Sequence, residues 1–265
     1  MLESQTDHGQ PIRVLLFGGG PVLERGVKEF ICRTEEHPEI EFLGAFIESR
    51  ARTASAVVKD LFRRRRLMAP PVLILMLAGT LSRYLAKPRN EIRLNRKMAS
   101  VSARLQYVPD VHAEEVLRRV SALSPDLGVA YSCPILKAEL FQIPKFGTLG
   151  IHHGKVPEYR GKKTTFWAMY NGEKSVGVTI QKINPGLDTG DVVRAGEVAV
   201  SGRPLRAVWK ELEQLGFDLF IDAILDVKHQ KAVYRPQTGA KGRLYRDPEV
   251  ADILKFWWKS IKKSL

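Results

Sequence analysis

The stretch I-R-V-L-L-F-G-G-G (Ile12–Gly20) decides the fold class of this chain. Its apolar, partly β-branched residues predict a buried strand, and the three glycines that end it permit a tight turn into a helix. A helical pattern follows at Val22–Arg33, and Pro38 separates it from a second strand candidate at Glu41–Ile47. This order of strand, glycine loop, helix and strand is the start of a doubly wound α/β sheet.

The alternation of strands and helices continues towards the C-terminus. Strands are predicted at 107–109, 127–131, 146–151 and 176–183, and helices at 112–123, 166–171 and 205–227. The pattern at 234–245 predicts either a strand or a loop. We therefore expect one α/β domain over residues 11–247, with a mostly parallel twisted sheet flanked by helices. A short amphipathic basic tail, rich in Trp and Lys, is expected at 248–265.

The positive charge of the chain is concentrated in one segment. The formal net charge is +13, and between residues 60 and 106 eleven basic residues face two acidic ones. We expect a basic helical insertion here. Arg63–Arg66 precede an apolar run, Leu67–Leu81, that is too short to span a bilayer but suits contact with an anionic membrane surface. The alternative is packing against the domain, with the arginines in solvent. Few aromatic residues accompany the charge, which disfavours a nucleic-acid partner.

The cysteines and the N-terminus indicate the compartment. Cys32 and Cys133 lack any paired spacing, which excludes a disulfide framework and a zinc knuckle. The polar N-terminus lacks the pattern of a secretory signal. We expect a cytoplasmic protein, with the membrane surface as a possible peripheral site, and no bound metal.

Residues 147–191 contain the side chains suited to chemistry. A strand places His152 at its end, where open α/β sheets bind their ligands. After the next helix and strand, a Pro-Gly turn presents Asp188 between Gly186 and Gly190. An imidazole can move a proton near neutral pH, and a carboxylate beside it can orient it or order a water. The pair predicts a proton-transfer site.

Four motifs in this region occur in the order and spacing of a known family. They are V-P-E-Y-R-G (156–161), F-W-A-M-Y-N-G-E (166–173), G-V-T-I (177–180) and G-L-D-T-G-D (186–191). The stretch resembles the folate-dependent formyltransferases, which include glycinamide ribonucleotide, methionyl-tRNA and sugar-amine formyltransferases. The resemblance is strongest from Tyr131 to Asp191, and it implies a Rossmann-like formyltransferase domain.

The resemblance also implies roles. The reaction would transfer a formyl group from 10-formyltetrahydrofolate to an amine, with His152 assisting proton transfer and Asp188 holding His152 or a water. The residues implied for the pterin are Ser132, Cys133, Pro134, Ile135, Leu136, Gly186 and Leu187. Residues assigned to the acceptor are Gly18, Gly19, Gly20, His153, Tyr159, Arg160 and Gly161. The three glycines are assigned from their place before a helix, where backbone N–H groups could hold a phosphate of the acceptor; the alternative is that they only permit the tight turn.

One position departs from the family pattern. Family members carry an asparagine two residues before the histidine, where it helps to hold the formyl oxygen; here that residue is Gly150. His153 is a candidate substitute donor. A non-catalytic protein that binds folate or a nucleotide therefore stays open as an alternative.

The acceptor is expected to be a small amine, such as a nucleotide-linked amino sugar. About 75 residues follow Asp191, too few for both the end of the domain and the C-terminal barrel of methionyl-tRNA formyltransferases. A protein of that type without the barrel is the other alternative. The sequence predicts no oligomeric state.

Overall fold

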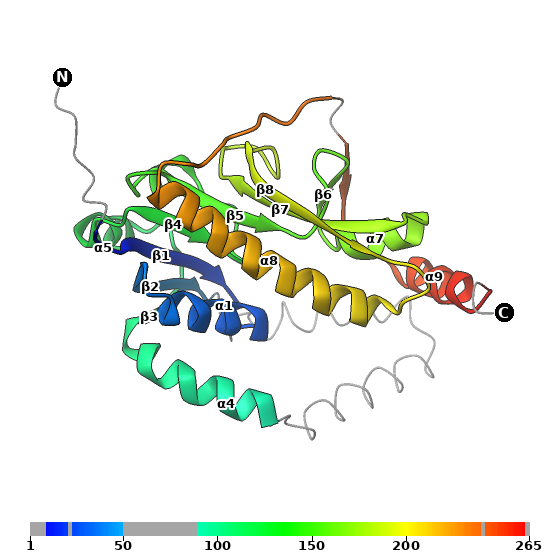
Figure 1. Cartoon of the computed structure of the whole chain (residues 1–265), viewed down its shortest axis with the longest axis horizontal. Helices are drawn as coiled ribbons and strands as arrows, with labels where there is room; N and C mark the ends of the chain where they lie inside the picture. Colours follow the sequence, from blue (N-terminus) through cyan, green and yellow to red (C-terminus); the bar gives the residue numbers. More distant parts are fainter. Residues whose placement is uncertain (1–8, 21–22, 50–88, 240–241, 263–265) are drawn as a thin grey trace.

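A computed structural model describes residues 9–20, 23–49, 89–239 and 242–262. Its seven-stranded sheet has the order β3-β2-β1-β4-β5-β7-β8 (Figure 1). The strands are β1 (Ile12–Gly19), β2 (Ile40–Glu48), β3 (Leu105–Val108), β4 (Leu127–Ala130), β5 (Thr148–His152), β7 (Ser175–Lys182) and β8 (Val192–Ala199). The first five are parallel, whereas β7 is antiparallel to both β5 and β8. The predicted mostly parallel sheet is confirmed.

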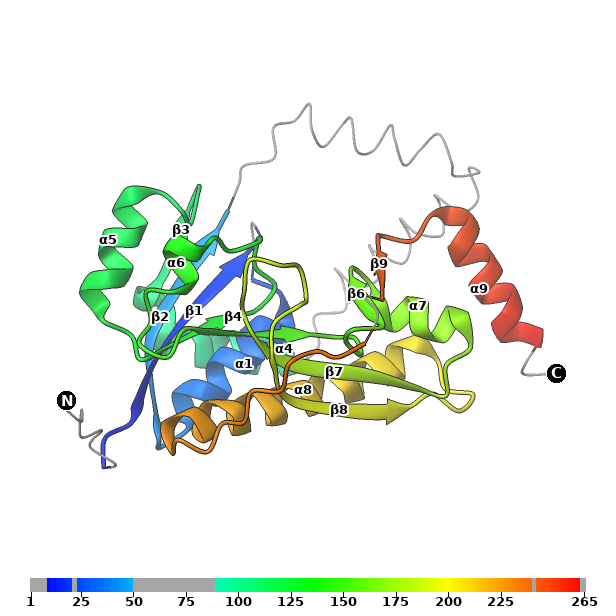
Figure 2. The same cartoon turned by 90° about the horizontal axis from the view of Figure 1, so that it is seen from above.

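Helices cover both faces of the sheet. One face packs against α1 (Arg25–Glu36), α4 (Arg89–Met98) and α8 (Leu205–Lys228). The other packs against α5 (Glu114–Leu123) and α6 (Ala138–Phe141), which lie at the opposite end of the molecule from α9 (Val250–Lys262) (Figure 2). A short helix, α7 (Thr164–Asn171), lies beside the two-stranded sheet of β6 (Tyr159–Gly161) and β9 (Arg243–Tyr245).

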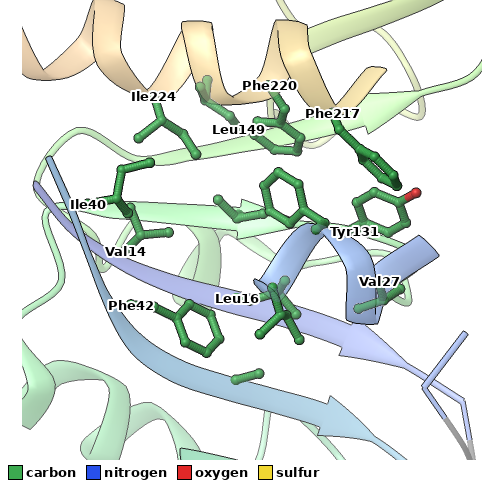
Figure 3. Packing of buried hydrophobic residues seen from close by; sticks show 14 of the residues in the cluster. Val14, Leu16, Val27, Ile40, Phe42, Tyr131, Leu149, Phe217, Phe220 and Ile224 are labelled. Carbon is green, nitrogen blue, oxygen red and sulfur yellow. The ribbon is translucent and has the colours of Figure 1, made fainter. Parts of the chain in front are cut away.

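Strand β1 is apolar from Val14 to Phe17, where it is buried on both faces. Val14 and Leu16 point into the cluster that contains Phe217 and Phe220 of α8 (Figure 3). Their neighbours Leu15 and Phe17 belong to the cluster on the other face, with α5 and α6. A continuous apolar run is what a central parallel strand requires. This is why Ile12–Gly20 was informative about the fold.

The structure changes the interpretation of the basic segment. Residues 60–88 of the predicted insertion lie outside the described residues. Residues 89–106 form α4, the 3₁₀-helix Ala99–Arg104 and the start of β3. Leu94, Met98 and Val101 are buried in the core, and β3 pairs with β2. This part of the segment therefore belongs to the layers of the domain, because its apolar side chains pack against α1 and the sheet.

Strand β8 was not predicted, and the helix after β1 begins at Arg25 instead of Val22. β8 is an edge strand in which Arg194, Gly196 and Glu197 interrupt the apolar residues, so its alternation is weak in the sequence. A Cβ at Gly196 would lie 3.0 Å from Leu215 and Leu219 of α8. The close approach of α8 therefore explains this glycine. The long helix predicted at 205–227 is confirmed by α8.

Candidate active site

His152 ends β5 at the carboxyl edge of the parallel strands. Its side chain is buried, and its Nε2 lies 2.7 Å from the carbonyl oxygen of Tyr159. Because a carbonyl only accepts hydrogen bonds, Nε2 must carry the proton. A Cβ at Gly154 would lie 2.4 Å from this nitrogen and 2.6 Å from the Tyr159 oxygen. Only glycine at that position leaves room for the bond that orients the ring.

The other ring nitrogen faces Asp188. His152 Nδ1 lies 3.4 Å from Asp188 Oδ1. With Nε2 protonated, Nδ1 of the neutral ring has a lone pair and can take up a proton. The carboxylate would stabilise the imidazolium formed in this way. The pair can therefore act as a general base.

The loop that carries Asp188 is held by hydrogen bonds of its own. The backbone N–H of Gly161 donates to Asp188 Oδ2 at 2.7 Å. Asn184 Oδ1 accepts from the N–H of Gly186 at 3.0 Å and from the hydroxyl of Thr189 at 2.9 Å. Asp188 itself has φ +52°, in the left-handed region that aspartate and asparagine tolerate better than most residues. These contacts fix the carboxylate before any ligand binds.

A first cavity, of about 220 Å³, opens on the Asp188 side. It is smaller than the roughly 300–1,000 Å³ of pockets that hold a drug-sized ligand, so it fits a bicyclic ring better than a whole folate. Ile135 and Leu187 line it and are 71% and 42% exposed. Such apolar side chains suit the faces of a flat ring. All the residues implied for the pterin line this cavity: Ser132, Cys133, Pro134, Ile135, Leu136, Gly186 and Leu187.

A second cavity, of about 800 Å³, opens on the His152 side. Of the residues predicted for the acceptor, it is lined by Gly19, Gly20, His153 and Gly161. Ser132, Cys133, Pro134 and Ile151 line both cavities and form a shared wall. Asp188 borders the first cavity and His152 the second, so the pair lies where two ligands would meet.

Three residues predicted for the acceptor line neither cavity. Gly18 lies within β1. Tyr159 donates its hydroxyl to Glu173 at 2.8 Å and serves the site through its carbonyl oxygen. Arg160 donates to the carbonyl of Gly242 at 3.1 Å. Their side chains therefore hold the surrounding loops.

The sequence also missed several residues of the site. Gln181, Lys162, Lys163, Trp209 and three glutamates line the cavities; the glutamates are Glu24, Glu48 and Glu213. For Gln181 a signal existed, because a long polar residue follows directly after the mostly apolar run Val176–Ile180. The other residues come from separate elements, and no sequence pattern indicated that they belong to the site.

The candidate substitute donor, His153, does not lie beside Gly150. His153 lines the second cavity and Gly150 the first. Its ring packs on Trp209 with centroids 4.6 Å apart, and its Nε2 is buried with no hydrogen-bond partner among the described residues. Burial, reinforced by His152, lowers the pKa of His153 to about 3. The ring is therefore neutral at physiological pH.

The low pKa of His153 predicts a loss of stability in acid. An unfolded histidine has a pKa of about 6.5, so between that pH and about 3 the unfolded state binds the proton more readily. Stability from this residue is complete above pH 6.5 and declines as the pH falls. At pH 5 the loss is on the order of 2 kcal/mol. Urea unfolding at pH 7 and pH 5 measures it: His153→Phe should remove this part of the decline, and the exposed control His229→Gln should keep it.

Among the described residues, Glu48, Asp110 and His112 bring possible metal-ligand atoms within 4.8 Å of one another. His112 Nδ1 lies 3.3 Å from Asp110, and Nε2 accepts the N–H of Lys137 at 3.1 Å. Both ring nitrogens are thus engaged within the protein. The group gives no support for a metal.

Comparisons with known proteins match about half of the chain to one family. The model of the formyl transferase family matches residues 85–212. The methionyl-tRNA formyltransferase of Thermodesulfovibrio yellowstonii is 33% identical over 129 residues, which are 48% of this chain and 42% of that protein. The chain thus spans less than half of that curated relative.

Two solved structures share the fold. A sugar N-formyltransferase from a Shewanella species superposes with a TM-score of 0.57 at 16% identity, covering 92% of this chain and 86% of that one. HypX from Aquifex aeolicus in complex with tetrahydrofolic acid gives 0.57 at 15% identity, covering 92% and 33%. At these identities the similarity concerns the fold alone.

Proposed function

Because the chain belongs to the folate-dependent formyltransferase family, we propose that it transfers a formyl group from 10-formyltetrahydrofolate to a primary amine. The observation that carries the proposal is the shared wall of the two cavities, with Asp188 on one side and His152 on the other. A donor in the first cavity and an amine in the second would meet at a general base.

The first cavity fits the donor in shape and chemistry. Its volume is about 220 Å³, it has apolar side chains at Ile135 and Leu187, and Asp188 is among the residues that line it. When bound, 10-formyltetrahydrofolate supplies an electrophilic formyl carbon attached to N10. Backbone groups of 132–136 and the loop at Gly186 would hold the ring system. The buried position of the His152–Asp188 pair keeps bulk water from competing with the amine.

In the proposed step, the amine nitrogen forms a bond to the formyl carbon and the bond from that carbon to N10 breaks. His152 Nδ1 takes up the proton that the attacking amine loses, and Asp188 stabilises the imidazolium. The same proton then passes to the departing nitrogen, so His152 ends neutral. The hydrogen bond from Nε2 to Tyr159 keeps the ring in place throughout.

The second cavity suits a small amine. Glu24, Glu48 and Glu213 would attract an ammonium group before it loses its proton. Burial, with Glu29 nearby, raises the pKa of Glu213, so this carboxyl group contributes less to the attraction than a fully charged one. Lys162 and Lys163 supply positive charge at another part of the lining. If the acceptor is a nucleotide-linked amino sugar, its phosphate would bind at these two lysines. Gly19 and Gly20 are less suited to the phosphate, because the negative charge of Glu24 in the same cavity would repel it.

A coupled assay tests the function directly. Purified protein is given 10-formyltetrahydrofolate and a panel of amines, and tetrahydrofolate release is followed by absorbance. Release that requires one amine would support transfer and identify the acceptor. Release without any amine would indicate a hydrolase. Folate binding without release would favour the non-catalytic alternative.

Membrane contact stays a separate prediction. Within the described part of the chain, no helix has the length and apolarity to cross a membrane. The apolar run at 67–81 lies outside that part, but α9 has Trp257 and Trp258 55% and 60% exposed beside Lys255. We expect the protein to float with phosphatidylglycerol vesicles at low salt and to dissociate at high salt, because salt screens the charges. No binding at low salt would contradict this prediction.

A further inference from the structure

Gly150 leaves the donor cavity without the side-chain amide that the family resemblance implies, and another amide lies opposite it. In the antiparallel pair of β5 and β7, Gly150 is the direct partner of Gln181. Directly paired residues present their side chains on the same face of a sheet. Gln181 is only 4% exposed, and both residues line the first cavity. A buried amide is therefore present where the glycine provides none.

The orientation of this amide follows from its neighbours. Gln237 Nε2 donates to the carbonyl oxygens of Gly190 at 2.8 Å and Asp188 at 3.1 Å, which identifies it as the nitrogen. It also lies 3.2 Å from Gln181, so the Gln181 atom there must be the oxygen Oε1. Gln181 Nε2 then faces Asp188 Oδ1 at 3.3 Å. An amide nitrogen carries two hydrogens, so one remains for a ligand.

The side chain of Ile183 explains why the amide comes from this strand. A Cβ at position 150 would lie 2.5 Å from Ile183 Cδ1, so an asparagine there would require Ile183 to move. Glutamine is one carbon longer than asparagine and reaches the cavity from β7. In this chain the amide that lines the cavity is therefore on β7, at Gln181, whereas the family pattern has it on β5, at the position of Gly150.

We propose that Gln181 is the donor that binds the formyl oxygen during transfer, with Gln237 as its positioning residue. The proposal rests on the proposed function. A hydrogen bond from Nε2 stabilises the negative charge that develops on this oxygen as the amine attacks. Removing one such donor costs on the order of a hundred- to a thousand-fold in rate in other enzymes. Gly150 is then compatible with full activity.

A binding experiment tests the contact without turnover. The full-length protein is mixed with 10-formylfolate labelled with ¹³C in the formyl group, and the carbonyl band is followed by infrared spectroscopy. A hydrogen bond lowers the frequency of this band in the wild type. Gln181→Leu should still bind the compound but lose most of the shift. Gln214→Leu, which removes a partly buried amide on α8 that bonds Glu29, is the matched control and should keep it.

Activity gives a second readout. Gln181→Leu should lower kcat by about 10²–10³-fold with little change in KM for the donor. Adding Gly150→Asn together with Ile183→Ala should restore at least about tenfold, since it returns an amide to the cavity. A purely structural role of Gln181 predicts no such rescue.

The outcomes separate this role from the proposed function. If 10-formylfolate does not bind the wild type, the proposed function falls, and the role of Gln181 with it. If it binds and the shift survives in Gln181→Leu, only the role of Gln181 is overturned. An unchanged kcat in Gln181→Leu would likewise overturn the role of Gln181 and leave the proposed function standing.

Discussion

Replacement of His152 by alanine is expected to lower kcat/KM for formyl transfer by about 10²–10⁴-fold, the usual contribution of a general acid or base. Nδ1 is the ring nitrogen free to take up the proton, because Nε2 is committed to the Tyr159 carbonyl. No other histidine has a ring nitrogen in contact with Asp188 in the described part of the chain. The assay is steady-state release of tetrahydrofolate with saturating amine.

Two controls give this result its meaning. His229→Ala changes a histidine on the surface after α8, 38% exposed, and should leave the rate unchanged. Thermal unfolding of His152→Ala checks that the buried substitution has not unfolded the domain. A folded His152→Ala protein with wild-type kcat/KM would refute the assignment of the base.

The second large effect is expected for Asp188→Asn. Asparagine has the shape of aspartate and accepts a positive φ, so the loop at φ +52° should keep its conformation. It lacks the negative charge that stabilises the imidazolium of His152. We expect kcat to fall by about 10²–10⁴-fold, in the range seen when the carboxylate partner of a catalytic histidine is removed.

The division of the effect between kcat and KM identifies the role of Asp188. A loss in kcat means that the carboxylate acts on His152 in the transition state. A rise in KM for the donor alone would mean that Asp188 only holds the donor, and would contradict the mechanism. Asp222→Asn, which removes a charge 3.5 Å from Arg194 on the outside of α8, is the control.

The predictable parts of the fold were those with strong local patterns. The apolar runs of β1, β4 and β7 appear in the sequence because each strand is buried along most of its length, and α8 appears because its buried residues recur at helical spacing. β8 was missed because only Val193 and Val198 of its eight residues are buried, so it has no continuous apolar run. Gln237 lies outside the stretch of strongest resemblance, yet its amide contacts Gln181 and the Asp188 loop.

The sequence by itself indicated the α/β class, the resemblance to the formyltransferases and the pairing of His152 with Asp188. These follow from burial over consecutive residues and from side chains within one continuous set of motifs, which are local properties. Tertiary structure decided the reversal of direction at β7, the division of the site into two cavities and the position of Gln181 opposite Gly150. These depend on which strands pair and in what register. Pairing is settled by packing between segments distant in the chain, and no local pattern records it.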